Sequence, residues 1–302
     1  MHPKTLTIVY NPKGGSASRN TVNELAGHFV SRDIKVEFLA TTAEPGSATK
    51  LAAQAAASGA KLVVAFGGDG TACQVAEGLR GSGVPMAIYP GGTGNLFAKA
   101  YYSPPTPDSF VEMVLNGKPQ AVDMVRVDYA DLAGKPQNRY FMVGFGLGKM
   151  SDAISSASPV FKQIFGRLVY VLKVSLACLW PNSRRFRLVE PDSDSSEEAA
   201  AVLALNVAPP MLTTISRGCN ASDGLIDVVV LRCTNILHLM GVALCLAFGK
   251  LERSKRYRRF RTNKLTIKCN KAMLPNIDGD PGVLTKEIRL TVDPGAVRII
   301  LS

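Results

Sequence analysis

A continuous apolar run that ends in a glycine-rich loop constrains this chain more than any other feature. Residues 62–66 read Leu-Val-Val-Ala-Phe, and Gly67-Gly68-Asp69-Gly70-Thr71 follows directly. An unbroken apolar strand is typical of a parallel sheet that helices cover on both faces. Open parallel sheets bind ligands beyond the carboxyl ends of their strands, where this loop lies. The segment therefore predicts a strand, a ligand-binding loop and a helix at the edge of a parallel sheet.

The first 120 residues repeat this alternation of strands and helices. Short apolar runs at residues 6–10, 34–39 and 86–89 alternate with segments of helical spacing at 17–30 and 45–57. This order predicts a parallel sheet covered by helices. We interpret residues 1–120 as a Rossmann-like, three-layer α/β nucleotide-binding domain.

The pattern changes near Ala121. Residues 122–129 alternate between apolar and polar, and further short strand-like runs continue to residue 301. Helical patterns interrupt these runs at about 160–178 and at 235–248. Such runs predict a mainly antiparallel domain. We expect residues 121–302 to form an antiparallel β-sandwich, with the last strand free to pack back on the first domain.

Two more glycine-rich loops follow predicted strands. Gly91-Gly92-Thr93-Gly94-Asn95 comes after the run at 86–89, and Asn11-Pro12-Lys13-Gly14-Gly15-Ser16 follows the first run. Glycines let phosphate oxygens approach main-chain N–H groups, and the N-terminus of a following helix adds unpaired donors. One such loop is as compatible with a simple turn as with a site. Three at one sheet edge predict a phosphate site.

Other sites for nucleotides and metals lack their motifs. No G-x-x-x-x-G-K-[ST] sequence is present, and no G-x-G-x-x-G sequence opens a helix. None of the six cysteines has C-x-x-C spacing, and there are only three histidines, which argues against a zinc cluster.

Together the three loops resemble the nucleotide-site motifs of the diacylglycerol kinase catalytic-domain family. This family includes soluble bacterial lipid kinases, sphingosine kinases and ceramide kinases. The matching motifs are residues 11–15, 67–71 and 91–95, in the family's order and spacing. The resemblance implies a kinase that transfers phosphate from ATP, with Mg²⁺, to a lipid hydroxyl of diacylglycerol, ceramide or a sphingoid-type acceptor. Residues 121–302 would then hold the lipid substrate.

The resemblance also implies which residues contact the nucleotide. Asn11 is expected to touch the phosphates, and Asp69 to lie near the phosphates or the catalytic Mg²⁺. The alternative for Asp69 is a carboxylate that caps a helix or a turn, but an acid among phosphate-cradling glycines favours a cation between it and the ligand. The expected nucleotide-binding residues are Asn11, Thr42, Gly67, Gly68, Asp69, Gly70, Thr71, Ala72, Cys73, Gly92, Thr93 and Asn95.

A carboxylate-bearing turn near residue 223 resembles the family's site for a structural Mg²⁺. Its implied ligands are Asn220, Asp223 and the main-chain carbonyl of Leu225. From the residues alone, Asp-Gly before an apolar run is an ordinary turn into a strand. Ser222 stands where the family has another aspartate, so one negative charge is missing.

A second such turn, Asn276-Ile277-Asp278-Gly279-Asp280, resembles the motif that carries the general base. The family usually has glutamate where this chain has Asp280, so the substrate must come closer or act through a bridging water. The implied catalytic residues are Asp280 and Asp69. Asp278 is expected to orient the loop or contact metal. The alternative is a simple turn without activity.

The formal charge of +11 indicates an anionic partner. Residues 250–261 concentrate basic side chains, which are compatible with a solvated face or a nucleic-acid patch. With a lipid substrate, we expect these residues to contact an anionic membrane surface and expect no nucleic-acid partner. The residues concerned are Arg256, Arg258, Arg259 and Arg261.

Scattered cysteines and the lack of a signal-peptide pattern favour a cytoplasmic protein, and the implied lipid substrate would bring it to the membrane periphery. The longest apolar segments, residues 168–180 and 236–248, are too short to span a bilayer. We expect both to be buried or interfacial helices.

Two other functions stay open at this stage. NAD kinases share a Gly-Gly-Asp-Gly-Thr loop, so a kinase with a soluble substrate is the nearest alternative. The loop at 91–95 and the Asp-Gly-Asp turn favour the lipid branch. Because Asp280 replaces glutamate, a catalytically silent protein that binds nucleotide or lipid is the other alternative.

Overall fold

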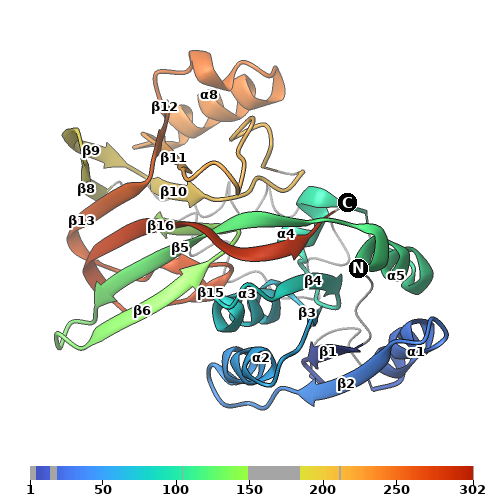
Figure 1. The fold of residues 1–302 in the computed structure, drawn as a ribbon. Coiled ribbons are helices and arrows are strands. Elements are labelled where there is room, and N and C mark those ends of the chain that lie inside the picture. The colour runs from blue at the N-terminus through green and yellow to red at the C-terminus, as the bar shows by residue number, and fades with distance from the viewer. Residues whose placement is uncertain (1–4, 14–18, 104, 149–183, 211, 302) are drawn as a thin grey trace. The chain divides into compact units, whose positions relative to one another are not determined.

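The computed structural model describes residues 5–13, 19–103, 105–148, 184–210 and 212–301 (Figure 1). The chain divides into two compact units, which are Met1–Met124 with Pro294–Ser302, and Val125–Asp293. The sequence placed this boundary at residue 120 and let the last strand pack on the first domain. The helices predicted at 160–178 and within 168–180 lie outside the described residues.

The first unit is built on a parallel sheet. Its strands are β1 (Thr5–Tyr10), β2 (Lys35–Ala40), β3 (Val63–Gly67) and β4 (Pro85–Pro90), in the order β2-β1-β3-β4. The end of β16 (Thr285–Ile300) joins this sheet, with Arg298 opposite Pro85 in parallel register. Every residue of β3 is buried, as its unbroken apolar sequence requires. The predicted parallel sheet is confirmed.

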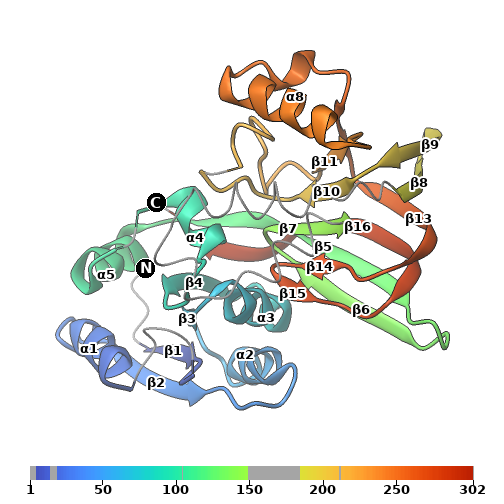
Figure 2. The same cartoon turned by 180° about the vertical axis from the view of Figure 1, so that it is seen from behind.

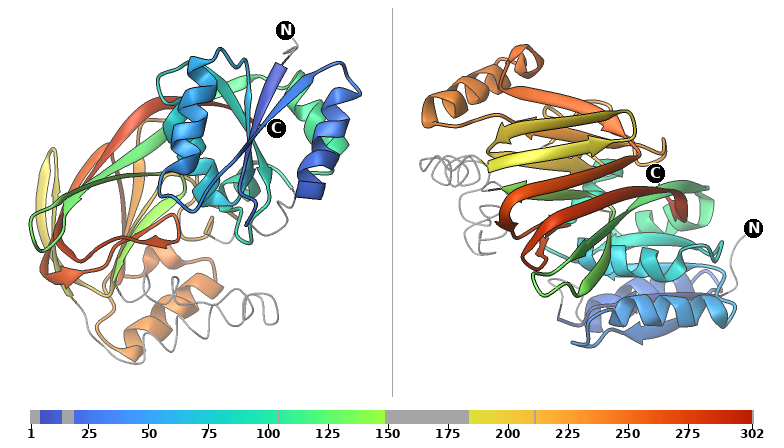
Figure 3. Two further views of the ribbon diagram at one scale, coloured as in Figure 1. Left: turned by 90° about the horizontal axis from the view of Figure 1, so that it is seen from below. Right: turned by 90° about the vertical axis from the view of Figure 1, so that its left-hand side faces the viewer.

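Helices cover both faces of this sheet (Figure 3, left). On one face, α1 (Arg19–Val30) and α5 (Pro107–Asn116) share an apolar core with the strands. On the other, α2 (Ser47–Ala57) packs closely against α3 (Asp69–Leu79). A Cβ atom on Gly78 would lie only 2.3 Å from the carbonyl oxygen of Thr49, so glycine is needed for this approach. The short α4 (Leu96–Tyr101) follows β4.

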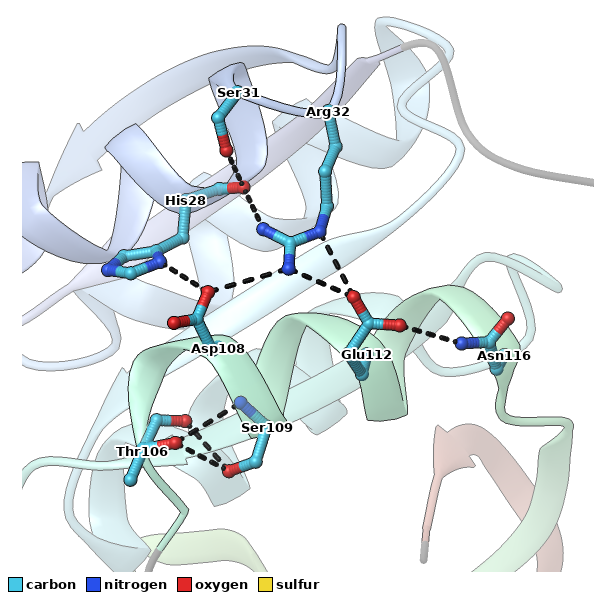
Figure 4. A network of polar contacts seen from close by, with 8 residues as sticks. All are labelled: His28, Ser31, Arg32, Thr106, Asp108, Ser109, Glu112 and Asn116. Atoms are coloured by element: carbon cyan, nitrogen blue, oxygen red, sulfur yellow. Dashed lines mark hydrogen bonds and ion pairs between the residues drawn. The ribbon is translucent and has the colours of Figure 1, made fainter.

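Polar side chains join α1 to α5 (Figure 4). His28 Nδ1 lies 2.7 Å from Asp108 Oδ1, and Arg32 donates to Glu112 at 2.9 Å. The hydrogen bond with His28 lowers the pKa of Asp108. Because these pairs are largely exposed, solvent screens their charges, and they add little to the packing energy of the buried core. Thr106 caps α5 by accepting from the Ser109 amide.

The second unit contains two antiparallel sheets. In one, residues of β16 up to Asp293 pair with β13 (Lys264–Met273), followed by β8 (Arg184–Glu190) and β9 (Ser193–Ala199). The hairpin of β5 (Pro119–Ala130) and β6 (Pro136–Phe141) also pairs with β16. The other sheet has the order β12-β11-β10-β7-β14-β15.

Figure 2 shows this second sheet with β14 beside β7. Its strands are β12 (Tyr257–Thr262), β11 (Ile226–Leu231), β10 (Ala201–Leu205), β7 (Gly144–Gly148), β14 (Asn276–Ile277) and β15 (Asp280–Pro281). Side chains from both sheets, such as Leu188, Val228 and Leu265, form one buried core. This is the sandwich arrangement expected for the second half.

A helix and a short 3₁₀ turn pack against the second sheet. They are α8 (Ile236–Ala247) and η1 (Leu251–Arg253), and they pack on β10, β11 and β12 around a smaller core that includes Leu231 and Tyr257. Among the described residues, no helix is both long enough and apolar enough to cross a bilayer.

Candidate nucleotide-binding and catalytic site

The residues expected to bind nucleotide lie at one edge of the parallel sheet. Asn11 follows β1, Thr42 follows β2, Gly67 ends β3, and Gly92 comes just after β4. Because the four strands are parallel, their carboxyl ends meet at the same edge. The fold therefore brings together motifs that lie far apart in the sequence.

Two of the glycine loops touch backbone to backbone. The Gly91 amide donates to the Gly67 carbonyl at 2.8 Å. A Cβ atom on Gly92 would lie 2.4 Å from the Cα atom of Gly68, closer than any side chain allows. Glycine at this position is thus required by the contact between the loops, in addition to any approach of phosphate.

The N-terminus of α3 opens at this junction. Gly68 is its N-cap residue and offers no side chain to the first-turn amides. The first N–H groups of a helix have no partner within the helix, and they carry a partial positive charge. This end of α3 is therefore suited to binding a phosphate group.

Asp69 connects the two loops. Its Oδ1 accepts a hydrogen bond of 2.9 Å from the Phe97 amide in the first turn of α4. A Cβ atom on Gly94 would lie 3.0 Å from Asp69 Oδ2. This is the capping role that the residues alone allowed. Among the described residues Oδ2 has no hydrogen-bond partner, so it fits an oxygen ligand to a cation that accompanies phosphate.

Asn95 shapes the second loop from within. Its backbone is in the left-handed region with φ of 50°. Its Oδ1 accepts from the Gly92 amide at 2.9 Å, while its Nδ2 donates to the Gly92 carbonyl at 2.7 Å. Both polar atoms of the side chain therefore hold the loop, whereas Thr93 is exposed at its tip.

The other two predicted contacts also stabilise turns. Asn11 Oδ1 accepts from the Lys13 amide at 3.0 Å, and Thr42 Oγ1 accepts from the Glu44 amide at 3.2 Å. The Thr42 amide in turn donates to Ser47 Oγ at 2.9 Å. The rest of the first glycine loop, residues 14–18, lies outside the described residues.

In the second unit, Asp278 anchors the Asp-Gly-Asp turn. Asp278 and Gly279 both have positive φ, of 50° and 93°, in the tight hairpin between β14 and β15. The Asp278 carboxylate accepts from three amides, those of Met142 at 2.8 Å, Val143 at 3.0 Å and Gly144 at 2.8 Å. The loop-orienting role expected of Asp278 is thus observed.

Asp280, two residues further on, is exposed. The fractional exposure of its side chain is 66%, and its Oδ2 lies 3.8 Å from Arg139 Nη2. Arg139 also donates to the Pro281 carbonyl at 3.2 Å. The turn thus combines a backbone fixed by Asp278 with a carboxylate that is open to a ligand.

Two supporting residues were missed by sequence reasoning. Arg139 lies beside Asp280, and no local motif marks it. Asn206, which is fully buried, donates to the Met142 carbonyl at 2.9 Å and so supports the segment that Asp278 binds. An asparagine directly after the apolar strand β10 was the available signal, since buried amides need partners.

Two arginine side chains of β12 pair with aspartates at the turn expected to hold a structural Mg²⁺. Asp223 Oδ2 forms a close ion pair with Arg261, and Asp223 Oδ1 accepts from the Leu225 amide at 3.1 Å. The neighbouring Asp227 is 1% exposed and pairs with Arg259 at 2.5 Å. A divalent ion beside two guanidinium groups would be repelled. The arrangement of Asn220, Asp223 and Leu225 therefore does not fit this ion.

Among the described residues, no group of three or more His, Cys, Asp or Glu side chains is arranged to hold a metal. The ligands expected at the Asp223 turn include one carboxylate only, so they would not form such a group, and it is the two nearby guanidinium groups that oppose Mg²⁺ there.

The arginines expected at a membrane are largely turned to partners inside the protein. Arg258 pairs with Glu190 at 3.5 Å and with Glu197. Burial alone would raise the pKa of Glu197, but hydrogen bonds from Arg232 and Arg258 outweigh it and lower the pKa. With Arg259 and Arg261 also paired, three of the four predicted membrane contacts are engaged. Arg256 has no ion pair among the described residues.

The fold and the site together define a class. It is an α/β protein with glycine loops at the carboxyl edge of its parallel sheet, and its second half is an antiparallel sandwich with an exposed carboxylate turn. Residues 5–127 match the family model described as diacylglycerol kinase catalytic domain. This match confirms the resemblance that the three glycine motifs indicated.

Proteins of similar sequence carry related names. A "Probable lipid kinase YegS-like" of Pseudomonas fluorescens is 27% identical, over 86% of this chain and 84% of its own. A "Diacylglycerol kinase" of Bacillus subtilis is 25% identical, over 92% of this chain and 90% of its own. These similarities support a kinase related to the lipid kinases.

Solved structures share the fold. A putative diacylglycerol kinase from Bacillus anthracis has a TM-score of 0.79 at 20% identity, covering 100% of this chain and 96% of that one. Yeast NADH kinase has a TM-score of 0.58 at 12% identity, covering 100% of this chain and 84% of that one. At these identities the likeness shows a common architecture only.

Proposed function

We propose that this protein is a lipid kinase that transfers the γ-phosphoryl group of ATP to the hydroxyl of a diacylglycerol, ceramide or sphingoid-type lipid. The observation that carries the proposal is the junction of two glycine loops beneath the open N-terminus of α3. That junction lies within the residues that match the diacylglycerol kinase catalytic domain.

In this proposal the first unit holds the donor. The first-turn amides of α3 bind phosphate oxygens, and the glycines allow those oxygens to reach the main chain. Mg²⁺ bound with the triphosphate supplies positive charge that offsets the charge of the phosphates. Asp69 Oδ2 is the side-chain atom best suited to hold that ion, because Oδ1 is already bound to the Phe97 amide.

The second unit supplies the general base. Asp280 accepts the proton of the lipid hydroxyl as its oxygen forms a bond to the γ-phosphorus. The bond from that phosphorus to the bridging oxygen breaks, and ADP leaves. Asp278 fixes the turn through its three amide hydrogen bonds, which leaves the exposed Asp280 carboxylate free to meet the hydroxyl.

Apolar side chains around the turn favour a lipid acceptor. Leu274, Val283 and Leu284 are 37%, 39% and 48% exposed. They lie on the hairpin that carries Asp280, where the Gly282 amide donates to the Pro275 carbonyl at 2.8 Å. Exposed aliphatic groups beside a carboxylate suit an alcohol with alkyl chains. Because such a lipid resides in a bilayer, the proposal includes peripheral contact with a membrane.

A kinase with a soluble acceptor is the second candidate, favoured by the fold shared with yeast NADH kinase. Incubating the protein with γ-labelled ATP, a panel of the three lipid classes and NAD decides between them. We expect label on a lipid. Label on NAD alone would replace the proposal with the second candidate.

The role of Asp280 is tested with two variants. We expect Asp280→Ala to abolish transfer while ATP affinity stays unchanged, and Asp280→Glu to retain activity, since both natural carboxylates can accept the proton. The unfolding temperature of both should match the parent, because the side chain is exposed. Full activity in Asp280→Ala would remove this residue from the mechanism.

A further inference from the structure

One face of α8 exposes large apolar side chains. Leu237, Met240 and Leu244 are 72%, 55% and 58% exposed, and Phe248, just beyond the helix, is 73% exposed. At 3.6 residues per turn, their spacing confines them to about 80° of the helix circumference. Contiguous exposed apolar groups of this size mark an interaction surface rather than a random scatter.

The opposite face fixes the helix to its unit. Val242 is buried, and Cys245 and Leu246 are partly buried against the core that contains Leu203 and Val229. Asn235 caps the helix by accepting from the His238 amide at 2.9 Å. The exposed face therefore belongs to a helix that is packed on its unit, and Figure 1 shows α8 at the margin of that unit, beyond the strands.

Unpaired cations border this face. Lys250, Arg253, Lys255 and Arg256 follow α8 and are exposed. Among the described residues none of the four has an ion pair, in contrast to the arginines of β12. The helix itself has no acidic residue, and Glu252 is the one acid in residues 236–256.

We infer that α8 and residues 250–256 form a docking surface for an anionic lipid bilayer. The inference rests on the proposed lipid-kinase function, since it supplies the partner in which the acceptor resides. The apolar face enters the boundary between headgroups and acyl chains, and the four cations lie against anionic headgroups. This inference places the membrane-binding surface at α8 and residues 250–256, whereas the sequence had indicated the arginines of β12, which are paired.

The dimensions of α8 fit a helix that lies on the membrane. Its 12 residues are about 18 Å long, well short of the roughly 30 Å hydrocarbon core. A second copy of this chain is the competing occupant of an apolar face. The adjoining cluster of like charges opposes it, because a symmetric contact would bring two such clusters together, whereas anionic headgroups complement them.

The test is co-sedimentation without nucleotide, using vesicles of phosphatidylglycerol and phosphatidylcholine in equal parts, and of phosphatidylcholine alone. We expect the protein to bind the mixed vesicles and to bind the neutral ones weakly. Leu237→Gln with Leu244→Gln should weaken binding about tenfold or more. Leu132→Gln, at another leucine that is 60% exposed, is the matched control and should bind as the parent does.

A charge pair gives an independent measurement. Lys255→Gln with Arg256→Gln should weaken binding to mixed vesicles about fivefold per residue, which corresponds to about 1 kcal/mol each. Lys35→Gln with Lys61→Gln, which removes two exposed cations of the first unit, should leave binding unchanged. The α8 variants should also phosphorylate a short-chain acceptor dispersed as monomers at the parent rate, since they alter docking alone.

Vesicle binding requires no catalysis, so it tests the surface even if no lipid is phosphorylated. Unchanged binding in the Leu237 and Leu244 double variant would overturn the inference. Analytical ultracentrifugation provides the other decisive result. A parent dimer that these substitutions dissociate, with vesicle binding unaffected, would assign the face to a second copy of the chain and overturn the inference as well.

Discussion

The glycine loops of the first unit and the carboxylate turns of the second are built from different parts of the chain. Between the loops, backbone contacts backbone, and a Cβ atom on Gly92 would collide with Gly68. In the turns, side chains make the structure, as Asp278 does with three amides and Asp223 with Arg261. A site made of backbone can be predicted from contiguous residues, because each loop has its own glycine motif. A site made of side chains depends on partners that are distant in sequence.

The same contrast separates Asp278 from Asp280. Both belong to one short hairpin, yet the first is fully engaged by backbone donors and the second projects into solvent. In the proposed mechanism, stability and reactivity are thus divided between two carboxylates of identical chemistry. Substitutions can test whether Asp278 and Asp280 have separate roles, and whether the glycine loops and the carboxylate turns do.

The largest effect is expected from Asp278→Ala. Removing the carboxylate leaves the amides of Met142, Val143 and Gly144 without a charged acceptor. Hydrogen bonds to charged groups contribute about 1.5–3 kcal/mol each, and water replaces part of that at this half-buried turn. We expect the free energy of unfolding to fall by about 3 kcal/mol, measured from the urea-induced unfolding transition of the second unit. Asp280→Ala is the control, and equal losses in both variants would refute the division of roles.

Gly92→Ala should have the next largest effect. The added methyl group forces the two loops apart, and overpacking of this kind costs about 1–3 kcal/mol. We also expect ATP affinity, measured by calorimetry, to fall more than tenfold because the cradle is distorted. Gly27→Ala is the control, since its Cβ meets nothing within 4 Å in the interior of α1. That change should stabilise by about 0.5–1 kcal/mol.

If Gly92→Ala bound ATP as tightly as the parent, the junction of the loops would be structural only. The two loops would then stabilise the first unit without forming the donor site.

Local patterns made most of the first unit predictable. The apolar run at 62–66 gave β3 almost to the residue, because a strand buried on both faces has no polar positions. The glycine motifs marked two loops that meet at one edge of the sheet, since the close contact of Gly92 with Gly68 demands glycine. The sequence did not show that Asp69 would cap α4, because the cap joins two elements through a long-range contact.

In the second unit, the alternation of β12 was visible but its partners were not. Residues 250–261 read as a basic surface because Glu252 is the one acid among them. Strand pairing then sets Arg261 opposite Asp227, and packing brings Arg258 to Glu197. Charge runs are therefore available to a membrane surface only where their side chains lack ion pairs, as those of Lys250, Arg253, Lys255 and Arg256 do among the described residues.

The smallest effect is expected at the Asp223 turn, where guanidinium stands in place of a metal. Without nucleotide, thermal unfolding of the parent should be the same in Mg²⁺ and in EDTA, because Arg261 already neutralises Asp223. Arg261→Ala should cost about 0.2–1 kcal/mol, the usual range for an exposed pair. It should also make unfolding sensitive to Mg²⁺, since the freed carboxylate can then accept the ion. Arg126→Ala, which breaks the exposed pair with Asp128, should not.

A parent unfolding temperature that rises with Mg²⁺ and loses this response in Asp223→Asn would restore the metal site. It would mean that the ion displaces Arg261, and that the turn is held by a cation bound from solution. The result expected here instead makes the Asp223 turn independent of metal, with Asp223 and Asp278 engaged by the chain itself and Asp280 the exposed exception. That one exposed exception is what the proposed chemistry requires.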